Sequence, residues 1–167
     1  MEIIFLLFGK MPLYDAICTS LGTAGTGGFG IKNDSFCSYN VYLQWVVTIF
    51  MILFGVNFNA YYLLFFGHIR DALKVEEVRY YFSIIIASVV VISVNIAHMC
   101  TGVFDAVTKA AFQVGSIITT TGFSSTDFDR WPELSKTLLV LLMFIGACAG
   151  STGGGIKAVS YKHLTLP

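Results

Sequence analysis

Charged side chains are scarce in this chain of 167 residues: Asp, Glu, Lys and Arg together make up 12% of it, whereas 56% of the residues are hydrophobic. A soluble domain carries about 25% charged residues. Three long stretches, residues 35–67, 80–97 and 137–156, contain neither a charged residue nor a histidine. A helix that crosses the ~30 Å hydrocarbon layer needs about 20 such residues. Because so short a chain could not cover three apolar helices in a soluble core, the sequence predicts an integral membrane protein.

The sequence also lacks the residue groupings that carry metal, redox or nucleic-acid chemistry. The formal net charge of +0 gives no indication of a nucleic-acid partner. No paired carboxylates and no His/Asp group lie within an apolar stretch, which argues against a membrane-embedded enzyme. Without a CxxC motif or a Cys/His cluster, we predict no bound metal and no cofactor. The four cysteines are widely separated, at Cys18, Cys37, Cys100 and Cys148.

The apolar stretches predict the membrane helices. We expect one continuous spanning helix over Val41–Phe66 and a second over Tyr80–Ala97. The charged residues 68–79 between them predict an aqueous connection. A third apolar block, Leu134–Ile145, ends in a run of glycines that cannot hold a stiff helix, so this span should be broken and mobile. The first apolar run, Ile3–Phe8, is not a typical signal peptide, and we interpret it as the end of a membrane helix.

Two shorter helical segments, Leu13–Leu21 and Asp105–Ile118, head a diverged internal repeat. Each begins near an Asp-Ala pair and leads into a Thr/Gly segment that ends in Gly-Phe, followed by a polar loop and a spanning helix. Such a repeat predicts the architecture. We therefore predict an all-α integral membrane protein of helix–pore loop–helix repeats with re-entrant half-helices, like that of potassium channels.

The composition of the two loops is typical of cation conduction. Irregular backbone at membrane depth is tolerated only where it is buried in protein or lines a water-filled cavity. Rings of backbone carbonyls can replace the hydration shell of an ion, and glycine permits the backbone angles that this requires. The short helix in front also directs its partly negative C-terminal end toward the loop. Glycine-mediated packing of helices is the alternative interpretation of these glycines.

Three motifs resemble the TrkH/KtrB superfamily of potassium transporters. They are TAGTGGFGIKNDS at Thr23–Ser35, SIITTTGFSSTDFDRWP at Ser116–Pro132 and LVLLMFIGACAGSTGGGIK at Leu139–Lys157. The resemblance extends from about Lys10 to Val159 and covers the second and third pore-loop repeats of the family. It implies that the chain is a fragment of a potassium uptake subunit and is inactive alone.

The resemblance also implies the organisation of the whole subunit. Four repeats would surround one pore in the cell membrane, so the missing repeats and membrane lipid are expected neighbours. A homodimer and a cytosolic nucleotide-binding regulatory subunit of the TrkA/KtrA type are expected partners. We expect residues 1–67 to form a repeat lacking most of its first helix, 68–79 a cytoplasmic linker and 80–159 the next repeat; residues 160–167 remain unassigned.

The resemblance implies two sets of site residues, each taken from the matching motif. The potassium filter would use the backbone of Thr26, Gly27, Gly28, Phe29, Thr120, Thr121, Gly122 and Phe123. An intramembrane gate would comprise Gly150, Ser151, Thr152, Gly153, Gly154, Gly155 and Lys157. The glycines 150–155 have the spacing of a phosphate-binding loop, but Ile156 stands where its lysine should be and no strand precedes it, so we reject that function.

Several polar residues have two interpretations each. Asn57 and Asn59 would bond to neighbouring helices or line the ion path, and His98 would be a functional residue or would cap the interface or bond to another helix. Asp127 and Asp129 would concentrate cations at an outer mouth or belong to a solvated loop, and Lys157 would serve the gate or anchor the helix at the interface. A structural membrane-assembly subunit with glycine-packed helices is the alternative function, and it predicts continuous helices across residues 22–30 and 119–122.

Overall fold

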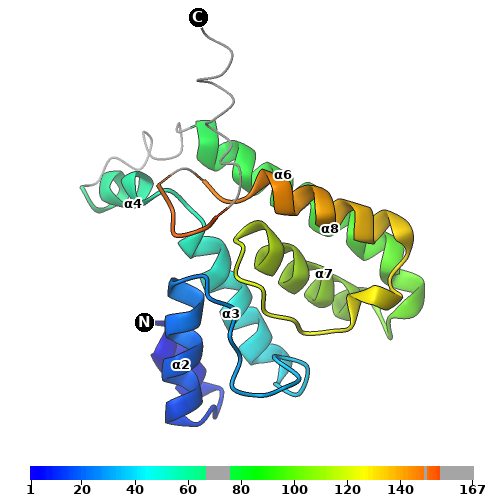
Figure 1. Cartoon of the computed structure of the whole chain (residues 1–167), viewed down its shortest axis with the longest axis horizontal. Coiled ribbons are helices and arrows are strands. Elements are labelled where there is room, and N and C mark those ends of the chain that lie inside the picture. The colour runs from blue at the N-terminus through cyan, green and yellow to red at the C-terminus, as the bar shows by residue number, and fades with distance from the viewer. Residues whose placement is uncertain (67–75, 149, 155–167) are drawn as a thin grey trace, which may run out of the picture.

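The computed structural model describes residues 1–66, 76–148 and 150–154 (Figure 1). Every regular element in these residues is a helix, and no strand occurs among them. The prediction of an all-α fold is therefore confirmed. Gly155 and Lys157 of the predicted gate, and most of the predicted linker, lie outside the described residues.

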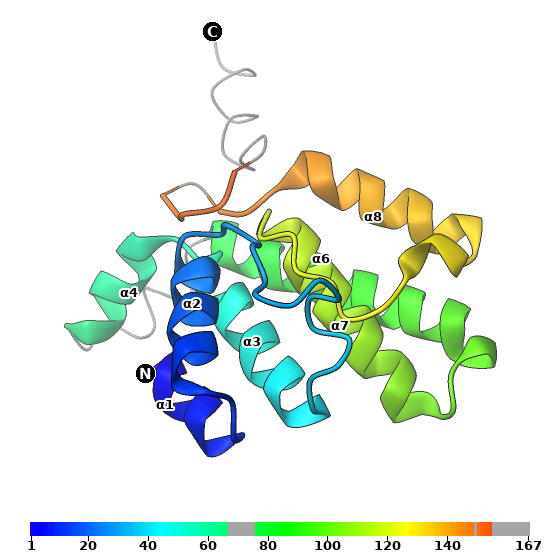
Figure 2. The ribbon, with the colours of Figure 1, turned by 60° about the horizontal axis from the view of Figure 1, so that its bottom comes forward.

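The helices form two sets with the same order. The first set consists of α1 (Glu2–Phe8), α2 (Leu13–Ala24), α3 (Val41–Phe54) and α4 (Phe58–Phe65). The second consists of α6 (Glu76–Ile96), the 3₁₀ turn η1 (Ala97–Met99), α7 (Val103–Ile118), the 3₁₀ turn η2 (Phe128–Arg130) and α8 (Glu133–Ile145). In each set the middle helix, α2 or α7, packs against the helix before it and the helix after it (Figure 2). We call the two sets repeat A and repeat B.

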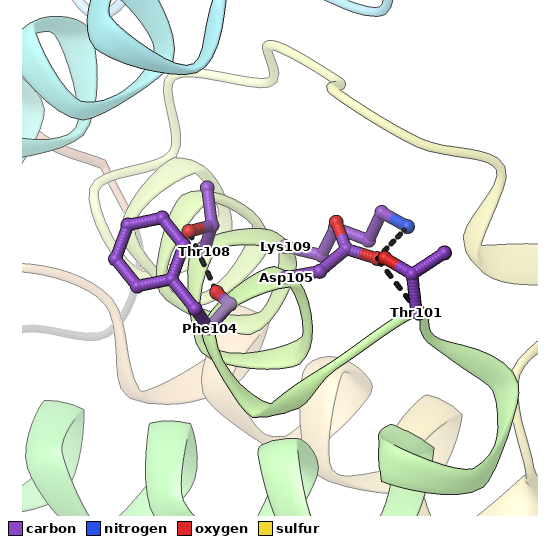
Figure 3. Close-up of polar contacts among 5 residues, drawn as sticks. All are labelled: Thr101, Phe104, Asp105, Thr108 and Lys109. Atoms are coloured by element: carbon purple, nitrogen blue, oxygen red, sulfur yellow. Dashed lines mark hydrogen bonds and ion pairs between the residues drawn. The ribbon is translucent and has the colours of Figure 1, made fainter.

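Polar side chains fix the start of α7 (Figure 3). The Asp105 carboxylate lies in the first turn and accepts hydrogen bonds from Thr101 and from Lys109 Nζ, the latter at 2.8 Å. The bond from Lys109 holds the pKa of Asp105 below its usual range. A negative charge at this end also stabilises the helix dipole. Thr101 before the helix and Asp105 and Lys109 within it therefore determine where α7 begins.

The prediction of one continuous span over Val41–Phe66 is wrong. Helix α3 ends at Phe54 and α4 starts at Phe58, with Gly55 in between. The carbonyls left open by this break are satisfied by groups far away in the sequence. The Tyr81 hydroxyl donates to the Ile52 carbonyl at 3.2 Å, and the Cys148 N–H donates to the Gly55 carbonyl at 3.2 Å. Such pairing satisfies main-chain groups that are buried in protein and have no water to bond to.

The other predicted spans fare differently. Helix α6 confirms the span predicted at Tyr80–Ala97 and starts earlier, inside the predicted linker, at Glu76. In the described part of the chain, the segment Glu77–Met99 alone is both long and apolar enough to cross a membrane. Helix α8 has 13 residues, about 20 Å at 1.5 Å per residue, which is shorter than the ~30 Å hydrocarbon layer. Its break at Gly146 agrees with the predicted end of the third apolar block.

The two repeats join along α3 and α7, which pack directly against each other. One buried cluster contains residues of α1, α2 and α3 and also Phe112 and Phe123 from repeat B. The second cluster is built mainly from α6, α7 and α8. The Trp45 indole N–H donates to Thr108 Oγ1 at 3.1 Å across the same junction. Repeat B thus inserts aromatic side chains into the core of repeat A.

Replacing Gly55 by alanine should destabilise the protein by about 1–3 kcal/mol, the usual cost of overpacking. A Cβ at this position would overlap the Tyr81 hydroxyl and lie 2.9 Å from Thr119 Cγ2. Gly115→Ala is the matched control, because its Cβ would meet its nearest neighbour, Ile52, at 3.5 Å. Thermal unfolding of the purified protein in detergent measures both changes. Equal melting temperatures for the two variants would show that the break tolerates a side chain.

Candidate functional site

The loops that follow α2 and α7 have matching backbone conformations. Thr26 and Thr120 have φ angles of 50° and 57°, and Gly28 and Gly122 have φ angles of 67° and 88°. A threonine with positive φ is uncommon, and such strain persists only where the surroundings enforce it. Two loops of different sequence adopt the same unusual pattern at equivalent positions. The pattern is thus a property of the repeat and not of one loop.

The same two loops lie side by side in the middle of the molecule (Figure 2). Gly28 sits directly against the carbonyl of Thr121, and any side chain at Gly28 would overlap that carbonyl. Residues 27–30 and 121–124 are not helical. The continuous helices that a glycine-packed assembly subunit requires are therefore not present there, and that alternative is wrong on this point. The structure brings together the filter residues that the sequence predicts in the two loops.

The two phenylalanines of the predicted filter have opposite surroundings. Phe123 is 1% exposed and its ring lies between the loop of repeat A and Gly22 of α2. Its carbonyl accepts a hydrogen bond from Ser116 Oγ at 2.5 Å, so it is directed into the protein. Phe29, by contrast, is 87% exposed. One repeat thus has its filter phenylalanine inserted into a neighbour, and the other has it uncovered.

The glycine-rich segment after α8 docks on the break between α3 and α4. Two of its glycines, Gly146 and Gly150, have φ angles of 67° and 74°, which favour glycine over any other residue. The Gly150 carbonyl accepts from the Phe58 N–H at 3.2 Å, and the Cys148 N–H donates to Gly55 at the same distance. We call residues 146–154 the glycine loop. Main-chain groups left unpaired at the α3–α4 break therefore bond to main-chain groups left unpaired after α8.

The glycine loop also bonds to both predicted filter segments. Thr26 Oγ1 donates to the Thr152 carbonyl at 3.2 Å, and the Gly154 N–H donates to Thr120 Oγ1 at 2.8 Å. A Cβ on Gly153 would lie 3.2 Å from the Thr119 carbonyl, which leaves little room for a larger residue. The two threonines with positive φ thus hold the same loop, one as donor and one as acceptor.

The remaining polar candidates lie away from the two loops or have protein partners. His98 lies on the exposed turn η1, and Asp127 pairs with Arg130 at 3.2 Å on the surface. Asn57 lies at the α3–α4 break, where its amide contacts Glu77 Oε2 at 3.5 Å. Among the described residues, no group of His, Cys, Asp and Glu could hold a metal ion. The site is therefore built from backbone and hydroxyl groups.

A family of known transport proteins shares this arrangement. The family model described as "TrkH: Cation transport protein" matches residues 7–164. The chain belongs to the TrkH family. In a comparison of structures, the crystal structure of the potassium transporter TrkH from Vibrio parahaemolyticus matches with a TM-score of 0.90 and 32% identity over 98% of this chain and 36% of that chain. The predicted resemblance, the fold class and the location in the cell membrane are thereby confirmed.

Curated relatives in the TrkH family support the same assignment. The Trk system potassium uptake protein TrkH of Vibrio parahaemolyticus is 34% identical over 97% of this chain. TrkG of Escherichia coli is 31% identical over 92% of it, and TrkI of Halomonas elongata is 28% identical over 97%. The chain spans about a third of the length of these relatives, namely 34%, 32% and 33%.

Sequence reasoning missed the docking site of the glycine loop at residues 55–58. Its only local signal is a glycine followed two residues later by Asn57 inside an apolar run. Sequence reasoning also missed the part played by Ser35 and Phe36, which contact the filter segment of repeat B. In both places, the partner lies far away along the chain, where periodicity and composition give no information.

Replacing Thr120 by valine should loosen the glycine loop, because valine keeps the shape but removes the acceptor of the Gly154 N–H. Losing a bond worth about 0.5–1.5 kcal/mol should raise hydrogen–deuterium exchange of residues 146–154 by about two- to tenfold. Thr137→Val is the control, since its hydroxyl bonds only to Glu133 within α8. Equal exchange in both variants would show that Thr120 does not hold the loop.

Proposed function

We propose that this segment translocates potassium ions across the cell membrane as part of a Trk-type uptake subunit. The observation that carries the proposal is the pair of Thr/Gly loops with the same strained backbone, in contact at Gly28 and Thr121. The relatives named as potassium uptake proteins support potassium as the transported ion. In this proposal the ion is the substrate, and the segment needs no cofactor.

The filter consists of backbone carbonyls from the two loops. Along an ordinary extended strand successive carbonyls point to opposite sides, whereas alternating positive and negative φ angles allow them to point to one side. Carbonyls of Thr26, Gly27 and Gly28 in repeat A, and of Thr120, Thr121 and Gly122 in repeat B, then replace the water around a desolvated cation. Phe123 anchors its segment, because its carbonyl already accepts from Ser116, and Phe29 has the equivalent place in repeat A. The C-terminal ends of α2 and α7 add favourable electrostatic potential.

Two pore-loop repeats do not close a ring, so this segment works within a longer subunit and is inactive alone. The exposed ring of Phe29 supports this, since its equivalent in repeat B is buried in a neighbouring repeat. A second observation concerns the filter glycines: Gly28 abuts a neighbouring filter segment, whereas a Cβ on Gly122 would meet nothing within 4 Å. Further repeats of the same subunit occupy both places. Residues 1–67 and 80–159 are then successive repeats, joined by a cytoplasmic linker at 68–79.

The glycine loop is the gate. It crosses from α8 to the α3–α4 break and is bonded to the first threonine of each filter segment, so it lies in the path of an ion that leaves the filter. Displacing it breaks a few hydrogen bonds and uncovers two small buried side chains, Ala147 and Cys148, a modest cost for an element that must open. Residues 150–155 form the obstruction and Lys157 places a positive charge beside it. A homodimeric assembly and a cytosolic nucleotide-binding subunit of the TrkA/KtrA type control its opening from the cytoplasmic side.

Gly122→Ser should weaken the preference for potassium over sodium. Gly122 has a φ of 88°, where a side chain strains the backbone and changes the direction of the adjoining carbonyls. The complete reading frame is expressed in bacteria that lack their own potassium uptake systems, and uptake of rubidium and sodium is compared. We expect the ratio to fall about tenfold, which corresponds to about 1.4 kcal/mol. An unchanged ratio at equal protein level would contradict the filter.

Deleting Gly153, Gly154 and Gly155 should raise leak conduction severalfold, because the bond between Gly154 and Thr120 is lost and the loop no longer reaches across the path. Electrical recording from the reconstituted subunit, without its regulatory partner, measures the effect. Thr137→Val, on the exposed side of α8, serves as the control. No change in current in the deletion variant would remove the gate from the proposal.

A further inference from the structure

Two residues of repeat A hold the end of the filter segment of repeat B. Ser124 directly follows Phe123, and both of its main-chain polar groups bond to one dipeptide. Its N–H donates to Ser35 Oγ at 3.1 Å, and its carbonyl accepts from the Phe36 N–H at 2.8 Å. We call Ser35 and Phe36 the clamp. The clamp fixes the position and direction of the chain where it leaves the filter.

The ring of Phe36 reinforces these bonds from the side. Phe36 is 1% exposed, and its ring lies edge-on to Phe123 with centroids 5.0 Å apart. It also contacts Phe112 of α7 at 5.6 Å. Aromatic pairs in such geometry contribute beyond their buried area. One side chain of repeat A therefore touches both the re-entrant helix and the filter phenylalanine of repeat B.

The clamp is itself held under strain. Ser35 is a non-glycine residue with a φ of 53°, and such a conformation persists only where neighbouring groups enforce it. Ser35 itself is held by its bond to Ser124 and by its own N–H, which donates to the Lys32 carbonyl at 3.1 Å. Two buried glutamines hold the neighbouring groups: Gln44 Nε2 of α3 donates to the Phe36 carbonyl at 3.1 Å, and Gln113 Nε2 of α7 donates to Ser124 Oγ at 3.2 Å. Hydrogen bonds from both repeats therefore surround the contact between the clamp and Ser124.

We infer that Ser35 and Phe36 are positioning residues that set the ion selectivity of the neighbouring filter segment. This inference rests on the proposed function. Neither residue contacts the ion; they act through Ser124 and Phe123 on the carbonyl of Gly122, which adjoins Phe123 directly. Since discrimination between cations depends on where the carbonyl oxygens lie, loosening the clamp lets these oxygens adapt to a different ion. Selectivity in repeat B is thus determined in part by residues of repeat A.

The test compares variants of the complete reading frame at matched levels in the membrane, with the ratio of rubidium to sodium uptake as the readout. Phe36→Leu removes the ring contacts, and Ser35→Ala removes one hydroxyl with little effect on folding. Phe50→Leu is the matched control: Phe50 packs on the same buried cluster, but its ring contacts Phe5 and Phe54 instead of the filter. Gly122→Ser serves as the reference for a changed filter.

We expect the ratio to fall about two- to tenfold in Phe36→Leu and Ser35→Ala, the change that corresponds to one aromatic pair or one hydrogen bond. Phe50→Leu should leave it unchanged. If both clamp variants lower only the total uptake while the ratio stays constant, their role is structural and the inference is overturned. A changed ratio in Gly122→Ser alone overturns the clamp and leaves the filter intact. An unchanged ratio in Gly122→Ser and in both clamp variants overturns the filter and the clamp together.

Discussion

The requirement that backbone polar groups at membrane depth either find partners within the protein or line a water-filled path governs this structure. Four chain segments stop being helical: the end of α3, the end of α8, the loop after α2 and the loop after α7. Each exposes main-chain groups that an uninterrupted helix would satisfy. The structure pairs these segments with one another, so that the glycine loop bonds to Gly55 and Phe58 on one side and to Thr26 and Thr120 on the other. Main-chain groups at each interruption thus find partners at another one.

The two repeats share one plan but do different work at their junction. Repeat A offers a slot between Gly22 and Phe36, and repeat B fills it with Phe123. Repeat A also supplies Gly28, whose missing side chain makes room for the Thr121 carbonyl. The contact is therefore directional: repeat A provides the receiving surface, and repeat B provides the groups that fill it. A directional contact of this kind forms a closed ring when the rotation between successive repeats closes, which is the arrangement that the proposed filter requires.

The sequence predicts the parts of the site that have a local cause. Residue composition alone predicts the Thr/Gly loops, the short helices before them and the helix end at Gly146, because glycine and threonine runs cannot continue a stiff helix. Residues 55–57 differ, since a single glycine is common in membrane helices and the break there depends on Tyr81 and Cys148. The clamp at Ser35 is likewise invisible in the sequence, because its strained backbone makes sense only beside Ser124.

The slot for Phe123 has a consequence for biosynthesis. Gly22, Phe36 and Gln44 all precede Phe123 in the chain, and a chain emerges from the ribosome at about 5–20 residues per second with its N-terminal parts folding first. The receiving site is therefore synthesised seconds before the side chain that fills it. Each new repeat can lock onto a finished neighbour as it enters the membrane, without reopening contacts already made. The repeat that receives Phe123 is thus also the repeat that is synthesised first.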